Sequence, residues 1–290
     1  MKFKFIADHQ TVFPVRRMCQ VLGVSASGYY AWRRRPVSER EQANQALLRR
    51  IQTIHADSQR TYGSPRVHAE LVAQGVACNE KRVARLMRLY HLRAKQTKRY
   101  RVKTTDSDHD LPVAPNRLNR QFEAEAPNAK WVSDITYIPT REGWLYLATV
   151  MDLFSRRIVG WSMAGTLSVS LVERALQMAI DQRRPSAGLL LHSDRGSQYA
   201  SAECRALLSH YQMVASMSRT GNCYDNAVIE SFFGTLKSEL VHHQQYETRD
   251  EGRRSVFAYI EAFYNRRRRH SALGYMSPVE FEQSHHGGLF

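Results

Sequence analysis

Apolar residues in the second half of the chain follow the spacing of strands first and of helices afterwards. Three apolar stretches at residues 130–138, 143–151 and 156–163 are rich in β-branched and aromatic residues, and turn residues separate them at 142–143 and 153–156. Short loops of this kind join consecutive strands as hairpins. This part of the sequence therefore predicts an antiparallel set of three strands.

Helices and strands alternate after these three stretches. A helical spacing at residues 169–182 precedes a buried strand at 188–193, and a second helix at 201–211 precedes a short strand at 213–216. A last helix covers residues 225–241. This order places the fourth strand beside the first one in a mixed sheet. It fits an α/β fold of the ribonuclease-H-like kind.

The front of the chain has the pattern of a helix–turn–helix unit. Apolar residues at helical spacing form the face of a first helix, and Gly23 follows where the motif needs a left-handed residue. Ser25 or Ser27 can cap the second helix, which ends in a basic run. We therefore predict a helix–turn–helix at residues 1–45. The basic run consists of Arg33, Arg34 and Arg35, which are candidate DNA contacts. The alternative is that these arginines are only a solvated helix end.

Residues 46–95 predict a second helical unit. A helix at 46–56 is followed by one with Ser64 as N-cap and Pro65 at its first position, which breaks at Gly75. A third helix, capped by Asn79, has an apolar face with arginines opposite it. The unit is helix–turn–helix-like with a longer turn, and a simple helical spacer is the alternative. The candidate DNA contacts here are Arg82, Arg85 and Arg88.

Charge is distributed unevenly along the chain. The 290 residues carry 42 Lys and Arg against 27 Asp and Glu, a net charge of +15. Residues 1–120 hold 24 of these basic residues and 9 of the acidic ones, whereas residues 121–290 hold 18 of each. A basic half joined to a neutral half suggests a nucleic-acid-binding region beside a domain with another function. The alternative is that the basic surface only aids solubility.

Composition argues against a membrane, secreted or zinc-binding protein. No apolar run approaches the ~18 residues that a membrane span requires, and the first residues lack a signal-peptide core. We therefore expect a cytoplasmic protein, associated with the nucleoid. The cysteines Cys19, Cys78, Cys204 and Cys223 are too scattered for a zinc knuckle, so we expect no zinc.

The remaining segments define the expected domain limits. Residues 96–127 are basic, then acidic, and contain proline, which predicts a linker that could lie along DNA. The α/β core is expected at residues 128–245. A helix at 249–264 and a basic tail complete the chain in the segment 246–290.

Three acidic residues stand in different local patterns. Asp134 lies in the first strand of the core, Asp194 ends the fourth strand, and Glu230 lies within the last helix, with 35 residues between it and Asp194. An Asp at a strand end is commonly a turn cap, so each acid alone proves little. Together they suggest a two-metal phosphoryl-transfer site, because carboxylates are the ligands that Mg²⁺ prefers and paired ions can clamp a phosphodiester. Asp152 and Asp225 are nearby acids for which structural roles are expected.

Residues 130–137, 192–199 and 221–237, which surround these acids, resemble the integrase core of DDE transposases. Within those enzymes the chain resembles the OrfB protein of insertion sequence family 3, a relative of retroviral integrases. The resemblance covers nearly the whole chain. It implies that Asp134, Asp194 and Glu230 are catalytic and hold two Mg²⁺ ions, for which Mn²⁺ can substitute.

The resemblance also implies which groups contact DNA and which partners act with the chain. Lys237 lies two helical turns after Glu230 and on the same face, where the family has a basic residue that contacts substrate DNA. Arg219 belongs to a small polar loop, 218–222, of the sort that orders around DNA. Expected partners are the terminal repeats, target DNA, further copies of the chain, and an OrfA partner or fusion. The tail contributes Arg266, Arg267, Arg268 and Arg269 as candidate DNA contacts.

Two other functions remain open at this point. A DNA-binding regulator could keep the core as a scaffold, although loss of an acid would have favoured it and all three acids are present. A metal-dependent nuclease or resolvase would cut without joining, using the same site. The expected activity is cleavage at the insertion-sequence ends followed by strand transfer into target DNA.

Overall fold

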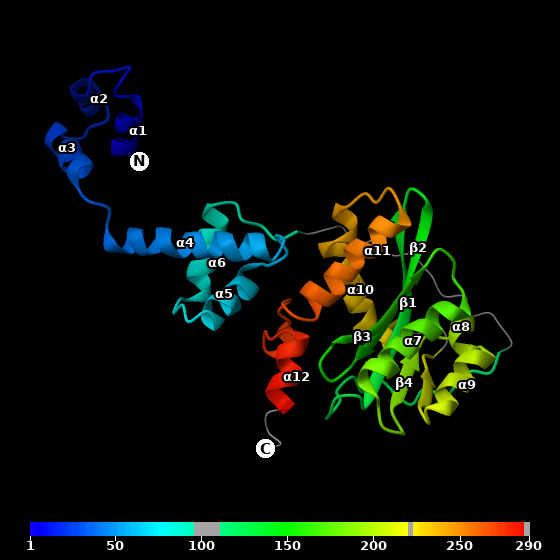
Figure 1. Ribbon diagram of the computed structural model, residues 1–290. Helices are drawn as coiled ribbons and strands as arrows, with labels where there is room; N and C mark the ends of the chain where they lie inside the picture. The colour runs from blue at the N-terminus through cyan, green and yellow to red at the C-terminus, as the bar shows by residue number, and fades with distance from the viewer. Residues whose placement is uncertain (96–110, 220–222, 287–290) are drawn as a thin grey trace.

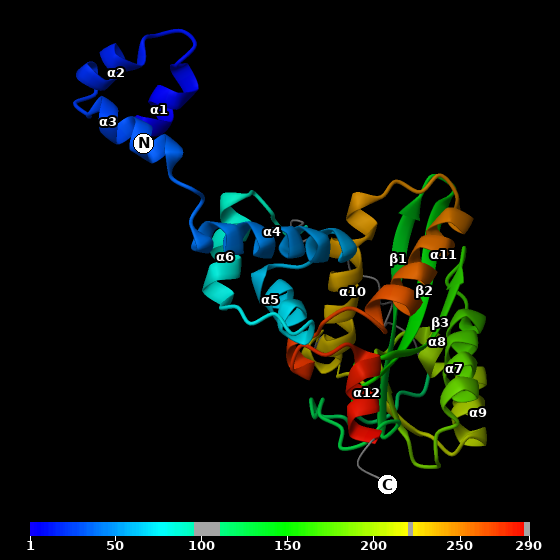
Figure 2. The same cartoon turned by 60° about the vertical axis from the view of Figure 1, so that its left-hand side comes forward.

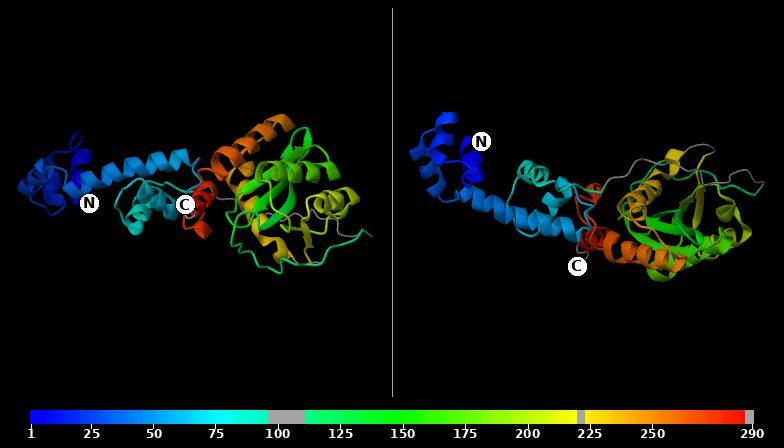
Figure 3. Two further views of the ribbon diagram at one scale, coloured as in Figure 1. Left: turned by 60° about the horizontal axis from the view of Figure 1, so that its bottom comes forward. Right: turned by 90° about the horizontal axis from the view of Figure 1, so that it is seen from above.

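The structure is a computed structural model that describes residues 1–95, 111–219 and 223–286. The chain is elongated: a small N-terminal helical unit stands away from the rest, a middle helical unit follows, and the α/β core lies at the other end (Figure 1). Figure 2 shows the same order of the three parts after a rotation. Figure 3 shows that the long helix α4 leads from the first part towards the core.

The N-terminal unit consists of α1 (Lys2–His9), α2 (Val15–Val21) and α3 (Ala26–Arg34). Gly23 has φ +61 between α2 and α3, as the turn requires, and the Ser25 hydroxyl caps α3 by accepting from the Gly28 amide. Helix α1 was not predicted. Its Ile6 is fully buried against Tyr29, so α1 supplies the third wall of this small core.

The middle unit consists of α4 (Glu39–Asp57), α5 (Ser64–Ala73) and α6 (Glu80–Leu89). Helix α4 begins before the predicted residue 46, because Ser38 caps it by accepting from the Glu41 amide. The prediction of Ser64 as N-cap was wrong by one position, since Gly63 precedes the helix and Ser64 is its first residue. Asn79 caps α6 as predicted.

The core is built on five strands in the order β3-β2-β1-β4-β5. The first three strands pair antiparallel, while β1 pairs parallel with β4 and β4 parallel with β5. The predicted neighbourhood of the first and fourth strands is therefore confirmed, as are the hairpin turns. The strands are β1 (Lys130–Thr140), β2 (Gly143–Asp152), β3 (Ile158–Ala164), β4 (Leu190–Ser193) and β5 (Val214–Met217).

Alternating side chains of the strands divide the core into two layers. In β2, Ala148 and Val150 pack on one face, while Leu145 and Leu147 pack on the other. Helices against the first face are α7 (Val169–Arg183), α8 (Ser197–Ala200) and α9 (Ala202–His210). Against the second face lie α10 (Ala227–Glu239), α11 (Arg249–Ala258) and the π-helical turn η3 (Tyr259–Tyr264). Short 3₁₀ turns are η1 (Cys223–Asn226), η2 (Val241–His243) and η4 (Ser271–Leu273).

One glycine fixes the distance between α7 and the sheet. A Cβ atom at Gly160 would come within 2.2 Å of the Ala175 carbonyl oxygen. No side chain fits there, so the helix packs directly on the β3 backbone.

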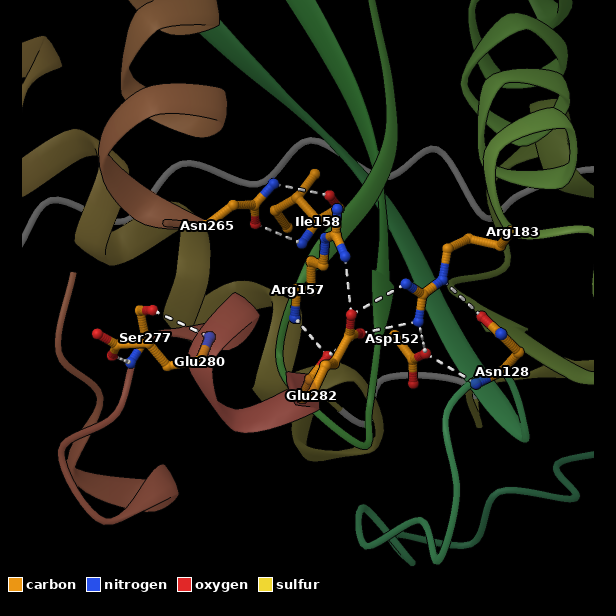
Figure 4. Close-up of polar contacts among 10 residues, drawn as sticks. Asn128, Asp152, Arg157, Ile158, Arg183, Asn265, Ser277, Glu280 and Glu282 are labelled. Carbon is orange, nitrogen blue, oxygen red and sulfur yellow. Dashed lines mark hydrogen bonds and ion pairs between the residues drawn. The ribbon is translucent and has the colours of Figure 1, made fainter. Parts of the chain in front are cut away.

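The C-terminal helix α12 (Pro278–His286) is joined to the core by a buried ionic network (Figure 4). Glu282 accepts from Arg157 at 2.7 Å and from Arg183 at 2.8 Å. Arg183 also lies 3.3 Å from the buried Asp152, which accepts from the Asn128 amide. Asp152 therefore belongs to the framework, in agreement with its expected structural role.

The segment before the core also packs on it. Leu118 is fully buried, and its amide and that of Arg117 donate to the Ser216 hydroxyl of β5. Residues 111–120 are thus held against the sheet, whereas 96–110 of the predicted linker lie outside the described residues.

Two of the four tail arginines bind carboxylates inside the protein, one in the core and one in the middle unit. Arg268 is buried and donates to both carboxylate oxygens of Glu239, at 2.6 Å and 2.8 Å. Arg269 pairs with Glu70 of α5, and its amide donates to the Tyr62 hydroxyl. The prediction that Arg268 and Arg269 contact DNA was therefore wrong, because their guanidinium groups bind carboxylates inside the protein. Arg266 and Arg267 are exposed.

In the ranges that the structure describes, no helix is long and apolar enough to cross a membrane.

Candidate active site

Asp134 lies in the middle of β1, opposite Thr149 of β2. Its alternate neighbours Val132 and Ile138 are buried in the core cluster that includes α10, so Asp134 shares the face of the sheet towards that helix. Its Oδ1 accepts from the Ile135 amide at 2.7 Å. The antiparallel pairing of β1 with β2 therefore positions this carboxylate.

Asp194 follows the last residue of β4, next to β1 in the sheet. Its Oδ1 accepts from the Gly196 amide at 3.0 Å, in the turn that leads into α8. Asp134 and Asp194 line one small pocket of about 40 Å³, together with Tyr137 and Gln198. The parallel pairing of β1 and β4 thus brings together two acids that are 60 positions apart in the sequence.

Glu230 approaches the same place from the first turn of α10, where it is exposed. The three charges act on one another: the pKa of Asp134 lies well above its ordinary value of 3.8, first because of burial and then because of the nearby Asp194 and Glu230 carboxylates. The structure therefore brings all three predicted acids into one electrostatic group.

Lys237 joins this group from the far end of α10. Its ammonium lies 4.4 Å from the centre of the Tyr137 ring, a cation–π contact. Burial lowers the pKa of Lys237, and the charge of Asp134 opposes that shift. The side chain is only partly exposed, so Lys237 is held over the site and is not a fully solvated helix lysine.

Buried polar groups hold the two aspartate strands. Tyr199 of α8 hydrogen-bonds to Ser133, the residue before Asp134, at 2.8 Å. His192 of β4 is buried between the Ser216 and Ser218 hydroxyls, and burial lowers its pKa to about 4. A neutral His192 therefore ties β4 to β5.

Asp225 and Arg219 bind each other near this site. Asp225 is buried and accepts from the Arg219 guanidinium at 2.9 Å and 3.0 Å, from Asn116 at 2.8 Å and from Arg120 at 3.1 Å. These bonds, with that of Arg219 first, hold the pKa of Asp225 well below its usual range. The helix N-cap is Asn226, so Asp225 anchors the segment before α10 and does not cap it. The other expected DNA-binding loop residues, 220–222, lie outside the described residues.

The arginines of the front half differ in their surroundings. Arg33 donates to Gln10 at 2.8 Å, while it and its two neighbours stay exposed at the end of α3. Arg82 donates to Asn44 of α4 at 2.9 Å, which gives it a structural contact. Arg85 and Arg88 are exposed.

The donor set suits a hard divalent cation, because it offers carboxylate oxygens and excess negative charge. Among the described residues, no three acid, His or Cys side chains are already gathered closely enough to form a complete metal cluster. Asp134 and Asp194 line the pocket together, and Glu230 stands beside them on the exposed face of α10. The chemistry of the acids therefore fits a metal.

Three family models match this chain. Two models described as integrase core domain match residues 124–223, which include Asp134 and Asp194, and residues 230–285, which begin at Glu230. A model of an HTH-like domain matches residues 42–100. The chain is 45% identical over 284 residues to the transposase InsF for insertion sequence IS3A of Escherichia coli (strain K12), covering 97% of this chain and 98% of that protein.

The chain belongs to the transposases of insertion sequence family 3. It is also 47% identical over 269 residues to an uncharacterized 31 kDa protein of insertion element IS600 from Shigella sonnei, covering 93% and 98% of the two chains. The family resemblance inferred from the sequence is thereby confirmed, and so is the integrase-type fold with helix–turn–helix-like helices in front of it.

Among solved structures, the chain resembles the HTLV-2 integrase catalytic core domain in complex with magnesium. The TM-score is 0.42 at 16% identity, covering 55% of this chain and 98% of that one.

Sequence reasoning missed Tyr137 and Gln198 as lining residues of the transposase pocket. Tyr137 stands three positions after Asp134 in the same strand, but strand alternation alone gives no sign that Lys237 lies over its ring. Gln198 lies in the short helix α8 that follows β4, where nothing in the sequence pattern marks it as a lining residue.

Proposed function

We propose that this transposase cuts DNA at the ends of its insertion sequence and joins the freed ends to target DNA at the site formed by Asp134, Asp194 and Glu230. The supporting observation is the convergence of three acids from two neighbouring strands and a helix, with the pKa of Asp134 raised by burial and by the other two charges. Such crowding is unfavourable for a folded chain unless the charges serve a ligand.

The acids would hold two Mg²⁺ ions, for which Mn²⁺ can substitute. When bound, divalent ions neutralise the charge that develops on a phosphodiester and activate the attacking oxygen. Asp134 must be ionised to act as a ligand, so protons and metal compete for it. The hydrogen bond that the Ile135 amide donates fixes one carboxylate oxygen of Asp134, and the other oxygen would be available to the ion.

Lys237 would bind a phosphate of the DNA end beside these acids. The Tyr137 ring limits the freedom of the ammonium group, and the charge of Asp134 opposes the lowering of its pKa by burial. A lysine held in this way loses less entropy when it binds a phosphate.

The exposed arginines of the front half would hold duplex DNA away from the reaction site. Arg33, Arg34 and Arg35 are exposed in the N-terminal unit, and Arg85 and Arg88 are exposed on α6. The terminal repeats and target DNA are the proposed substrates. Further copies of the chain, and an OrfA partner or fusion, are the proposed protein partners.

An assay that scores joined products separates this proposal from a nuclease that only cuts. Labelled insertion-sequence ends are incubated with the protein, target plasmid and Mg²⁺, and nicked and joined products are resolved. We expect both products. Nicked ends without joined DNA would favour a nuclease or resolvase, and intact ends despite tight binding would favour a DNA-binding regulator.

A further inference from the structure

A second pocket, of about 350 Å³, lies behind the helix that carries Glu230. Ser231 and Thr235 of α10 line it at a spacing of four residues, whereas Glu230 and Lys237 lie on nearly the opposite side of the helix. The other walls come from α5, from the β2–β3 turn and from the tail after η3. The pocket is therefore distinct from the active site and lies where the middle unit, α10 and the tail meet.

Arg156, in the β2–β3 turn, lines this pocket with an unsatisfied donor. Its Nη1 is buried and has no hydrogen-bond partner within the part of the chain that the structure describes. Its Nη2 reaches only the Phe122 carbonyl oxygen, at 3.5 Å. The residue has φ +60, a conformation that favours glycine, so the backbone holds an arginine at a strained position. A buried guanidinium without its partners is costly.

Two further arginines line the same pocket and share one carboxylate. Arg268 donates to Glu239 at 2.6 Å, and Arg66 of α5 lies 3.6 Å from the same oxygen. Glu123 acts on Arg156 from a greater distance, through its charge alone. Three guanidinium groups therefore face two carboxylates, which leaves excess positive charge around the cavity.

The pKa shifts of Arg66 and His270 agree with this excess, whereas, despite burial, the hydrogen bonds to Glu239 raise the pKa of Arg268. Burial lowers the pKa of Arg156 and also of Arg66, where Arg268 adds to the effect. The pKa of His270 lies well below its ordinary value because of burial and then because of the three arginines. His270 is therefore neutral and can donate or accept a hydrogen bond without adding charge.

We propose that this pocket is an anion site that binds one phosphate group. Guanidinium forks match phosphate oxygens in geometry, and the Ser231 hydroxyl adds a neutral donor. The walls also include the buried rings of Phe232 and Tyr264, beside which charge-assisted bonds are stronger than in open solvent. A bound phosphate would satisfy Arg156 and would bridge Arg66 of the middle unit to the helix that carries the catalytic acid. Its source is either the backbone of bound DNA or free phosphate.

Inorganic phosphate titrated into the full chain tests the site, with chloride at equal ionic strength as reference and with calorimetry and thermal unfolding as readouts. Arg156→Gln should weaken phosphate binding at least about tenfold, the usual effect of losing charge-assisted bonds. Ala272→Glu places a carboxylate at the exposed rim, where folding is not at risk, and should weaken it similarly.

Arg184→Gln is the matched control. Arg184 is also an arginine at positive φ, +44, but it is exposed at the end of α7 and does not line the pocket. It should bind phosphate as the wild type does. Equal phosphate binding by the wild type, Arg156→Gln and Ala272→Glu, together with an unchanged duplex affinity, would overturn the proposal.

A second experiment, on the binding of duplex DNA, identifies the source of the phosphate. If DNA supplies it, Arg156→Gln should reduce the log–log salt dependence of duplex binding by about one unit, and phosphate should compete with duplex. If the site takes free phosphate, the duplex salt slope stays unchanged while phosphate binding is lost. Glu230→Gln should bind phosphate and duplex as the wild type does, even though it should not cut DNA. A failure of the proposed reaction can therefore be distinguished from a failure of the phosphate site.

Discussion

The acidic side chains of the core fall into two groups that the structure treats differently. Asp225, Glu239 and Glu282 each accept hydrogen bonds from arginine, and each joins segments that are distant in the sequence. Asp134 instead lies beside Asp194 and Glu230. Burial and then these two charges raise its pKa, whereas Arg219 lowers the pKa of Asp225. Both groups are built from the same residue types.

The difference between the groups separates framework from function. An acid held by arginine stabilises the fold, and its charge is already compensated. Acids that repel one another at one edge of the sheet destabilise the folded state. Such a group of acids is typical of a site that binds a positively charged ligand. The same contrast divides the arginines: Arg268 is compensated inside the protein, whereas Arg33 projects into solvent.

The largest expected effect follows from removing a charge of the crowded group. Asp194→Asn or Glu230→Gln should lower cleavage and joining by about 1,000-fold or more, because a metal ligand is lost while the volume is unchanged. A gel assay with labelled ends checks this, and circular dichroism checks the fold. Near-normal cleavage by Glu230→Gln in Mg²⁺ would exclude Glu230 as the third ligand.

The next effect concerns the framework group. Glu239→Gln should destabilise the protein by about 3–5 kcal/mol, because it leaves the buried guanidinium of Arg268 without its countercharge. The exposed pair of Glu247 with Arg141 offers a matched control, and Glu247→Gln should cost less than about 1 kcal/mol. Urea denaturation measures both. Similar costs for the two variants would remove the distinction between compensated buried acids and surface acids.

Lys237→Ala should have a smaller effect on activity. We expect cleavage at limiting DNA to fall about tenfold, since one charged contact to a phosphate is lost, with no decrease in Mn²⁺ affinity. Lys130→Ala is the control, because that lysine donates to the Gln121 and Glu123 carbonyls away from the pocket. Cleavage kinetics and Mn²⁺ calorimetry give the two readouts. Unchanged cleavage would contradict a DNA contact by Lys237 and would leave it as an ordinary, partly buried lysine.

The smallest effect is expected in the separate N-terminal unit. Arg33→Ala and Arg34→Ala should each reduce the salt dependence of duplex binding by roughly one unit in a log–log plot, if each contacts one phosphate. Arg254→Ala, which removes an exposed arginine of α11 paired with Asp250, should leave the slope unchanged. Fluorescence anisotropy across a salt series measures all three. Salt slopes equal to that of the wild type for Arg33→Ala and Arg34→Ala would exclude these two arginines as phosphate contacts.

Much of the core could be predicted from the sequence, because its signals are local. Strand and helix spacing, Gly23 and the cap at Asn79 act within a few residues, and the strand order follows from the order of elements. Helix α1 was not predicted, because Phe3 and Ile6 indicate an apolar helix face only once their contact with Tyr29 is known.

The partners of the charged residues could not be predicted, because they come from distant segments. Arg266 to Arg269 form one basic run in the sequence, yet the turn after η3 directs Arg268 towards Glu239 and leaves Arg266 in solvent. The three acids were identified from their places in two strands and a helix, and the family resemblance then implied a catalytic role for them. The pairing of Asp225 with Asn116 and Arg120, more than 100 positions away, had no local signal.

Thermal unfolding and cleavage measured together on Asp134→Asn and Asp225→Asn test the contrast between the two groups most directly. The folded-state pKa of Asp134 lies above its ordinary 3.8, so its contribution to stability is present at low pH and is lost as pH rises. Asp225 has a lowered pKa, so its contribution is present at neutral pH and is lost on acidification.

Without metal at pH 7, we therefore predict that Asp134→Asn unfolds at the same or a higher temperature than the wild type and neither cuts nor joins DNA. Asp225→Asn should unfold at a lower temperature, yet cut and join DNA wherever it remains folded. An active Asp134→Asn, or an Asp225→Asn that is fully stable and inactive, would contradict the assignment of these acids to reaction and framework.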